Sequence, residues 1–340
     1  MSKYIGVDLG TANTLVYCKG KGIVLNEPSV VAVRVSNGAV LAVGEQAKQM
    51  IGKTPEEIAV IRPLQGGVIA DFDIAHAMLK AFLEKACPGG FLKPYVTVCV
   101  PYGVTDVERR AVLEAVVRSG GKNAYVIEEP MAAALGADLA PLSAVGSMVA
   151  DIGGGTCEVA VVSFGGTVSG TSVRYAGDKM DRDIGAYIKE HHGVFIGERT
   201  AERIKLAIGS ACPVSEETET TVMGRDEMSG LPKMVTVTSE EVRLAMAPTV
   251  EKIICAIKAT LENTPPELAT DIARQGIVLT GGGANIPGLP RLIQGKTGIP
   301  AYVAENPEEC VAKGAGIALT AVSDKTAVRT GKFFAGKAGA

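Results

Sequence analysis

The sequence predicts an α/β fold of two duplicated lobes, each carrying a small inserted subdomain, with a ligand cleft between the lobes. The chain has 340 residues, which is too long for one ordinary hydrophobic core. Residues 4–25 read as an apolar strand, a small-residue turn and a second apolar strand, and residues 147–168 repeat this pattern. Strands at 95–100 and 276–280, each followed by a helical stretch, add an α/β pattern to each half.

The two strand-turn-strand segments match at a fixed offset of 143 residues. A single Asp-x-Gly turn would be explained best by chance, but here two such turns lie in matching hairpins. Two copies of one unit half a chain apart therefore indicate a duplicated domain. The offset superposes Asp8 on Asp151, Gly10 on Gly153, Val16 on Val159 and Gly22 on Gly165.

Three helices have clear boundary signals. Thr105 is an expected N-cap with Glu108 three residues later, which together form a capping box. Another helix is expected to start at Pro130, where proline and the preceding glutamates suit a helix N-terminus. A third is predicted over about 240–262, with Pro248 expected to kink it.

Two stretches interrupt the α/β plan and predict the small outer subdomains, one per half. Residues 33–65 carry short strand and helix signals without a strong core pattern. Residues 180–245 contain helices followed by a polar, hairpin-like stretch, TETTVMGRDEMSGLPKMVTVT.

Composition limits the classes of function. The chain is 47% hydrophobic and 21% charged, as in a folded globular protein, and its net charge of -3 gives no overall attraction to nucleic acid. The 7 cysteines include no C-x-x-C pair and no signal-peptide pattern precedes them, which predicts reduced thiols in the cytoplasm. No apolar run is long enough to span a membrane.

Three glycine-rich turns follow strands, at 8–13, 151–156 and 280–285. Such turns let backbone N–H groups approach phosphate oxygens, so three of them predict a nucleotide site. Asp8 and Asp151 open two of the turns and are expected to hold Mg²⁺ beside the phosphates. Thr11, Asn13 and Thr156 could bind phosphate oxygens. Neither a P-loop nor a dinucleotide fingerprint is present.

The motifs, in chain order, resemble those of the MreB family, the bacterial actin homologues, over nearly the whole length. The turns alone would fit actin, a sugar kinase or a chaperone ATPase equally well. The further motifs favour MreB or a close paralogue. They are NEPSVVA (26–32), IRPL (61–64), GVIAD (67–71), TDVERRA (105–111), EEPMAAA (128–134), GERTAE (197–202), TPPEL (264–268) and LTGGG (279–283).

The resemblance implies roles for individual residues. Asp8 and Asp151 hold Mg²⁺ through water, and Glu129 orients or activates the attacking water. Glu202 and Lys205 contact the adenosine. The implied nucleotide-binding turns comprise Gly10, Thr11, Ala12 and Asn13 in the first phosphate loop, Gly153, Gly154, Gly155 and Thr156 in the second, and Gly281, Gly282, Gly283 and Ala284 under the adenine and ribose.

Three positions beside these residues are read as structural. Glu128 is expected only to cap the helix that follows it. Cys157 stands where the family usually has threonine, and we expect it to pack in the core, since buried cysteine is usually inert. Leu15 occupies the place of a phosphate-binding lysine in actin, as is normal for MreB-like chains.

The resemblance implies an actin-like ATPase fold with ATP in the cleft between four subdomains. The expected subdomains are IA (1–32, 66–145 and 316–340), IB (33–65), IIA (146–179 and 246–315) and IIB (180–245). It also implies a homopolymer of paired protofilaments on the inner face of the cytoplasmic membrane, which works with the cell-wall elongation machinery to maintain rod shape. Hydrolysis to ADP and phosphate is expected to be slow and to time filament dynamics.

A membrane anchor is predicted in the loop CPGGFLKPY (87–95). Phe91 and Leu92 are an apolar pair between glycines and a proline, an unusual composition for a surface loop. They would dip into the bilayer, as a loop at this place does in MreB proteins without an amphipathic N-terminus. The alternative is that the pair packs against the neighbouring helix.

Three other functions stay open at this point. A small-molecule kinase of the same superfamily would need an acceptor site in the cleft. A chaperone ATPase would need a substrate-binding domain, which the sequence does not show. A scaffold that binds ATP without hydrolysing it would not need Glu129.

Overall fold

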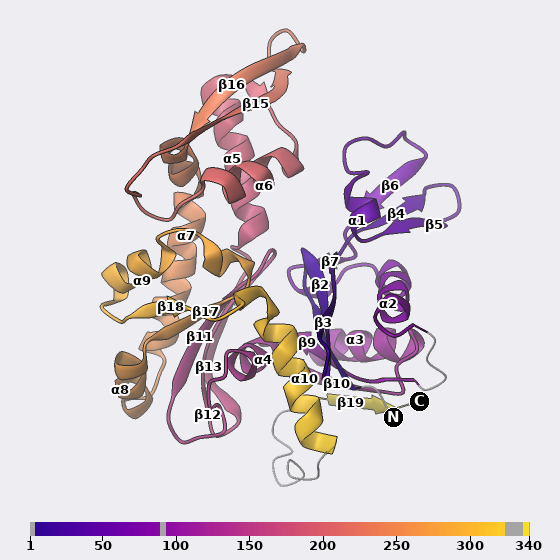
Figure 1. Ribbon diagram of the computed structural model, residues 1–340, viewed down its shortest axis with the longest axis vertical. Coiled ribbons are helices and arrows are strands. Elements are labelled where there is room, and N and C mark those ends of the chain that lie inside the picture. Colours follow the sequence, from indigo (N-terminus) through magenta and orange to yellow (C-terminus); the bar gives the residue numbers. More distant parts are fainter. Residues whose placement is uncertain (1–3, 89–92, 324–335, 340) are drawn as a thin grey trace.

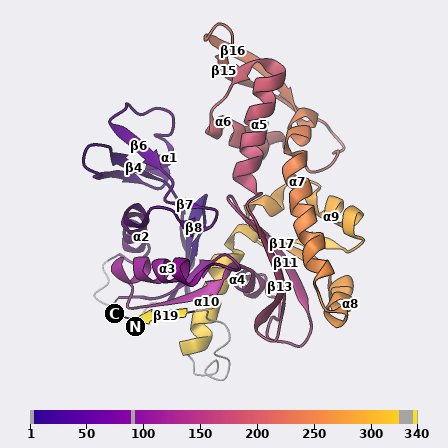
Figure 2. The same ribbon diagram turned by 180° about the vertical axis from the view of Figure 1, so that it is seen from behind.

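The computed structural model describes residues 4–88, 93–323 and 336–339. Two lobes lie side by side, each with a large sheet and a small sheet beyond it (Figure 1). The view from behind shows the same two columns, with the α4 and α10 helices between the large sheets (Figure 2). The predicted anchor residues Phe91 and Leu92 lie outside the described residues.

The large sheets share one topology, and their strands are rich in buried β-branched residues. The first lobe has the order β19 (Gly336–Gly339), β10 (Asn123–Glu128), β9 (Tyr95–Val100), β1 (Tyr4–Leu9), β2 (Asn13–Cys18), β3 (Gly22–Pro28). The second has β18 (Ala301–Val303), β17 (Ile277–Thr280), β11 (Ser147–Ile152), β12 (Cys157–Ser163), β13 (Gly166–Val173). Strand β19 is an addition to the common five-strand plan.

The strand register confirms the predicted duplication. Asp8 lies opposite Leu15 in the antiparallel pair β1–β2, and Asp151 lies opposite Glu158 in β11–β12. Asp151 follows Asp8 by 143 positions, and Glu158 follows Leu15 by the same number. The two hairpins therefore pair in the same hydrogen-bond register. On the other side, β1 pairs in parallel with β9 and β11 with β17.

Each inserted stretch folds into a small three-stranded sheet with helices. The first consists of β4 (Val31–Arg34), β5 (Val40–Val43), α1 (Glu45–Lys48) and β6 (Ile58–Ile61). The second consists of α5 (Gly177–His192), β14 (Val194–Phe195), α6 (Glu198–Ile208), β15 (Glu219–Asp226) and β16 (Pro232–Thr238). The division into four subdomains stays a prediction, and one of its boundaries, at 315/316, falls inside helix α10 (Cys310–Ser323).

The remaining helices cover the sheets. Helix α3 has the predicted capping box of Thr105 and Glu108, and α7 has a second one, formed by Thr238 and Glu241. Helix α4 begins at Glu129, one residue earlier than expected, and Pro248 lies inside α7. Their bounds are α2 (Phe72–Ala86), α3 (Asp106–Arg118), α4 (Glu129–Gly136), α7 (Ser239–Glu262), α8 (Pro266–Gln275) and α9 (Leu289–Thr297), and the two-stranded β7 (Leu64–Gln65) and β8 (Val68–Ile69) precede α2.

Helices α4 and α10 cross between the lobes, where glycine permits backbone contact. A Cβ atom on Gly136 would stand 1.8 Å from the carbonyl oxygen of Cys310, and one on Gly314 would stand 1.8 Å from that of Ala132. Gly136 and Gly314 are 178 positions apart, as are Ala132 and Cys310, so the duplication exchanges the two contacts. The crossing therefore has approximate twofold symmetry and joins the cores of both lobes.

Among the described helices, none combines the length and apolar character that crossing a bilayer requires.

Candidate functional site

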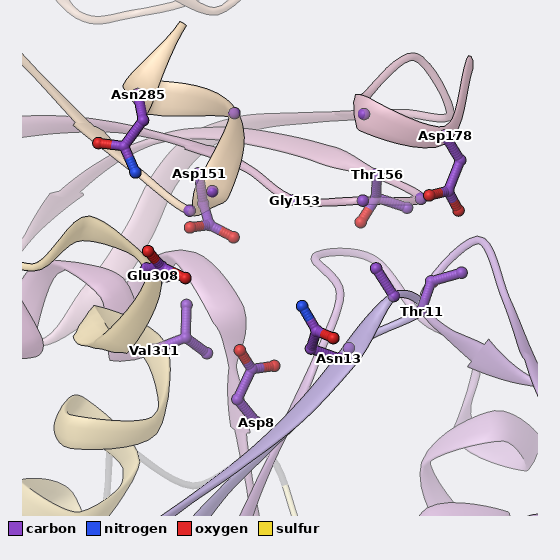
Figure 3. A pocket seen from close by; sticks show the side chains of 18 of the residues that line it. Asp8, Thr11, Asn13, Asp151, Gly153, Thr156, Asp178, Asn285, Glu308 and Val311 are labelled. Atoms are coloured by element: carbon purple, nitrogen blue, oxygen red, sulfur yellow. The ribbon is translucent and has the colours of Figure 1, made fainter. Parts of the chain in front are cut away.

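A cavity of about 400 Å³ lies between the lobes, where the three glycine turns converge. The first turn follows β1, the second follows β11, and the third follows β17 and forms a short 3₁₀ helix at Gly282–Asn285. Strands β1 and β11 are equivalent in the two sheets, so the first two turns reach the cavity from opposite sides, while the third comes from the same sheet as the second. Figure 3 shows Asp8, Thr11 and Asn13 on one wall and Asp151, Gly153 and Thr156 on the other.

The first two turns touch each other at the wall of the cavity. A Cβ atom on Gly154 would lie 2.4 Å from the Cβ of Ala12, and one on Gly155 would lie 2.6 Å from the Oγ1 of Thr11. Thr11 and Gly154 are equivalent under the 143-residue offset, as are Ala12 and Gly155. Glycine in the second turn thus leaves the space that side chains of the first turn fill.

Asp8 and Asp151 point into the cavity from opposite lobes (Figure 3). Burial, reinforced by the charge of Asp151, raises the pKa of Asp8 to about 8. Burial raises the pKa of Asp151 to about 6, although the hydroxyl of Thr280 donates a 2.7 Å hydrogen bond to its carboxylate. The buried carboxylate of Asp151 and the partly buried carboxylate of Asp8 therefore face one space, and a cation there would relieve the cost of charging them.

Two carboxylates are a donor set that Mg²⁺ accepts when its remaining ligands come from elsewhere. Within the described part of the chain, no group of three or more His, Cys, Asp or Glu side chains could hold a metal ion. Mg²⁺ usually takes one or two carboxylates and completes its shell with water and phosphate oxygens. Asp8 and Asp151 would supply the protein ligands of such a site.

Two further acidic residues, Glu129 and Glu158, are electrostatically linked to the aspartates, and of these two only Glu129 lines the cavity. Glu129, the first residue of α4, lines the cavity, and burial raises its pKa well above the usual range, with the charges of Glu158, Asp8 and Asp151 adding to the effect. Glu158 in β12 is fully buried, and it accepts hydrogen bonds from Ser172 Oγ (2.6 Å) and the backbone N–H of Tyr102 (3.2 Å). Burial raises the pKa of Glu158 to about 7.

The capping role expected for Glu128 is wrong. Glu128 is the N-cap residue of α4, but its side chain makes no hydrogen bond to the helix N-terminus. Its Oε2 accepts a 3.0 Å hydrogen bond from the hydroxyl of Thr167 in β13, which belongs to the other lobe. Glu128 therefore joins the two lobes, and a partner 39 residues away could not be seen in the local sequence pattern.

The predicted adenosine contacts lie at one end of the cavity on α6. Lys205 Nζ lies 2.8 Å from Asp181 and 2.9 Å from the carbonyl oxygen of Gly177. Burial raises the pKa of Asp181 to about 6 despite the opposing effect of the Lys205 charge. Glu202, one turn earlier on α6, pairs with Lys48 of the first lobe at 2.9 Å. Both α6 residues are thus held by neighbours while they line the cavity.

The structure gathers nearly all the predicted nucleotide residues in this cavity. Asp8, Glu129, Asp151, Glu202, Lys205 and the turn residues line it, whereas Ala284 is buried behind the wall. Cys157 is fully buried, and burial raises the pKa of its thiol, which fits the expected packing role. The lining residues to which the sequence analysis gave no role are Gly67, Gly177, Asp178, Asp181, Leu206, Asn285, Ile286, Pro287, Glu308 and Val311.

One of these residues had a signal that could have been used. Asn285 ends the third glycine turn, so the pattern that identifies Gly281, Gly282 and Gly283 also identifies Asn285. Asp178 and Asp181 stand at the start of α5, and Glu308 and Val311 come from the region where α10 begins. Only the fold brings these segments to the cavity.

Comparison with known proteins agrees with this geometry. A model of the MreB/Mbl protein family matches residues 2–327. The chain is 50% identical over 316 residues to the cell shape-determining protein Mbl of Bacillus subtilis (strain 168), covering 93% of this chain and 95% of Mbl. It is 51% identical over 324 residues to the cell shape-determining protein MreB of Escherichia coli (strain K12), covering 94% and 93%.

A solved crystal structure has a fold similar to that of this chain. The crystal structure of MreB5 of Spiroplasma citri bound to AMPPNP superposes with a TM-score of 0.92 at 36% identity, covering 97% of this chain and 99% of that one. The ligand of that structure is an analogue of ATP. The two-lobed α/β architecture is therefore shared with a protein that holds an adenine nucleotide.

Proposed function

Because this chain belongs to the MreB/Mbl family, we propose that it is an actin-like ATPase of the bacterial cytoskeleton that binds ATP with Mg²⁺ between its lobes. It would polymerise into filaments, paired as protofilaments, and direct cell-wall elongation and rod shape. The relatives' description as cell shape-determining proteins supports this role. The observation that carries the proposal is the meeting of two equivalent glycine turns over a cavity that Asp8 and Asp151 face from opposite lobes.

The residues of the chain divide the chemistry between them. The backbone N–H groups of the turns at 8–13 and 151–156 would bind the phosphates, and Asp8 and Asp151 would hold Mg²⁺. Mg²⁺, when bound, supplies charge neutralisation for phosphoryl transfer. Gly281, Gly282 and Gly283 would lie under the adenosine, with Glu202 and Lys205 beside it.

Glu129 is the proposed proton acceptor. Phosphoryl transfer to water requires a group that orients the nucleophile, and Glu129 is the carboxylate in the cavity at the N-terminus of α4. Its raised pKa suits a residue that takes up a proton. Hydrolysis would change the closure of the lobes and hence the stability of the filament.

The test compares Glu129→Gln with Glu128→Gln, a matched change at the neighbouring residue, which does not line the cavity. Glu129→Gln should lower the phosphate release rate by about 100-fold while ATP binding persists, and Glu128→Gln should retain most of the rate. Filaments in electron micrographs of the wild type with ATP would support polymerisation. ADP formation that depends on an added sugar would instead identify a kinase.

Membrane attachment through Phe91 and Leu92 is a further part of the proposal. Filaments would bind an anionic lipid monolayer, which serves as a model of the inner face of the membrane, because many weak apolar anchors act together along a polymer. A Phe91→Ser/Leu92→Ser variant should polymerise in solution and leave the monolayer bare. Val107→Ser, which removes an exposed apolar side chain elsewhere on the first lobe, is the control. Equal lipid binding by the double variant would contradict the anchor.

A further inference from the structure

The two lobes are joined at the mouth of the cleft by charged side chains of their small subdomains. Helix α1 of the first lobe faces α6 of the second (Figure 1). Lys48 Nζ lies 2.9 Å from both carboxylate oxygens of Glu202. The two residues are 154 positions apart, and each side chain is partly exposed, 24% for Lys48 and 35% for Glu202.

A second cation of the first lobe makes a similar contact. The guanidinium of Arg62, which follows β6, pairs with Glu198 at the start of α6 and lies 3.6 Å from Asp178 of α5. In the opposite direction, Arg199 donates a 3.5 Å hydrogen bond to the backbone carbonyl of Gln49. We call the pairs Lys48–Glu202, Arg62–Glu198 and Arg62–Asp178 the cleft-mouth pairs. In all three, the first lobe supplies the cation and the second supplies the acid.

The cleft-mouth pairs overlap with the wall of the nucleotide cavity. Glu202 and Asp178 line the cavity, whereas Glu198 does not. A carboxylate can accept several hydrogen bonds, so Glu202 can hold the ammonium of Lys48 and a ligand hydroxyl at the same time. A bound nucleotide and a cation of the opposite lobe can therefore fix the same carboxylate.

We propose that Lys48 and Arg62 are positioning residues that couple nucleotide occupancy to closure of the lobes. They hold the acidic side of the cleft mouth against the first lobe, and the nucleotide is retained while these pairs are made. This inference rests on the proposed nucleotide binding and adds the residues that set its release rate. Linkage requires the reverse effect as well: a nucleotide that contacts Glu202 favours the closed arrangement of the lobes.

The strength expected of such pairs makes them suited to a reversible closure. A partly exposed ion pair contributes little by itself and is screened by salt. Two cations that act on one rigid-body motion bias its equilibrium without locking it, so the cleft can still open for exchange.

A charge swap at Arg62 and Glu198 tests the coupling directly, because Glu198 stands outside the cavity. The measurement is the release rate of etheno-ATP with Mg²⁺, chased by excess ATP, at a protein concentration where sedimentation detects no filaments. Arg62→Glu and Glu198→Arg should each release the nucleotide about two- to fivefold faster, given the usual strength of such pairs. The double variant Arg62→Glu/Glu198→Arg should reverse part of this increase, as a direct pair requires, while the new carboxylate at position 62 still stands beside Asp178.

Lys48→Met should also speed release, and Lys53→Met is its matched control, since Lys53 is an exposed lysine of the same subdomain. Raising the salt concentration from about 50 mM to about 500 mM should speed release from the wild type but not from Lys48→Met/Arg62→Met. Wild-type release rates in the single variants, or no rescue by the swap, would overturn the coupling alone. A wild type that binds no etheno-ATP would overturn both the coupling and the proposed nucleotide binding.

Discussion

The two large sheets share a five-strand order, and their first hairpins, β1–β2 and β11–β12, pair in the same register, yet the sheet edges at the cavity differ in composition. The first lobe places Thr11 and Ala12 at its turn, where the second lobe has glycines that these side chains cover. Opposite the aspartate that faces the cavity, the first lobe has Leu15 and the second has Glu158. The duplicated backbone thus supplies a symmetric cleft, and the side chains that differ between the copies make its two walls chemically unequal.

The two aspartates show the same inequality at one position. Asp151 receives a hydrogen bond from Thr280, whereas Asp8 has no side-chain hydrogen bond or ion pair among the described residues. Asp8 accordingly has the higher pKa, about 8 against about 6. The first lobe therefore bears the larger cost of charging its carboxylate before a cation is bound.

The largest effect is expected from changes that break the symmetric helix crossing. Gly136→Ala and Gly314→Ala should each destabilise the protein by about 3 kcal/mol or more, because the new methyl group would overlap a backbone carbonyl of the opposite helix. Urea denaturation of each variant measures the loss. The two values should agree closely, since the duplication exchanges the contacts.

Gly185→Ala provides the control for helical glycine. Gly185 lies within α5, and nothing stands within 4 Å of the position of its Cβ. Alanine there should stabilise the protein by about 0.5–1 kcal/mol through helix propensity alone. If Gly136→Ala or Gly314→Ala behaved like Gly185→Ala, the close crossing of α4 and α10 would be contradicted.

The second prediction concerns pH and the unequal aspartates. A carboxyl whose folded pKa is raised binds its proton more tightly in the folded state, so its contribution to stability is full below about pH 4 and is lost as the pH rises to about 8. Asp8→Asn should remove this loss and make the nucleotide-free protein about 2 kcal/mol more stable at pH 8. Thermal denaturation at pH 5 and pH 8 measures the difference.

Asp151→Asn is the matched variant in the second lobe. Its gain at pH 8 should be smaller, because the pKa of Asp151 is raised less and its carboxylate already has the Thr280 hydroxyl. Equal gains in the two variants would contradict the inequality of the two walls. Both variants should weaken the binding of Mg²⁺ with ATP.

The third prediction sharpens the contrast between Leu15 and Glu158. The charge of Glu158 adds to the burial that raises the pKa of Glu129. Glu158→Gln should therefore move the acidic limb of the ATP hydrolysis profile to lower pH by roughly 0.5–1 unit. Glu114→Gln, an exposed change on α3, is the control. An unchanged profile would show that Glu158 has no influence on the proton acceptor.

The smallest expected effect compares two capping boxes, one in each lobe. Thr105→Ala and Thr238→Ala each remove a hydroxyl that accepts the N–H of the third helical residue, and each should cost about 1 kcal/mol of unfolding free energy. Glu241 of the second box also contacts His192 at 2.8 Å, so this box retains a tertiary contact. Serine at either position should restore most of the loss, and a failure of both serines would point away from capping.

The duplicated hairpins, several helix starts and most of the cavity wall could be predicted from the sequence, because local residue patterns determine them. The offset of 143 residues gives both the topology and the register, and capping residues mark helix starts. The glycine turns and their aspartates identify most of the cavity wall.

The rest depends on contacts between distant segments. The close crossing of α4 and α10 depends on Gly136 and Gly314, which are 178 positions apart. Both glycines lie in alanine-rich stretches that resemble ordinary helix interiors, so the sequence does not reveal the crossing. Lys48 and Arg62 look like solvent-exposed charges until the fold brings α6 beside them. Glu128 follows the pattern of a helix cap, and only the packed second lobe reveals its partner, Thr167.

The place of α10 has a consequence for how the protein is made. This helix follows the strands of the second lobe in the sequence, yet it packs on β1 and β9 of the first lobe, and a Cβ on Gly6 of β1 would meet its backbone at 2.3 Å. A ribosome releases residues in order, so the first lobe emerges early and keeps an open apolar face until the second lobe has been synthesised. The lobe that is translated first is therefore completed last, and during that interval it is a natural client for chaperones.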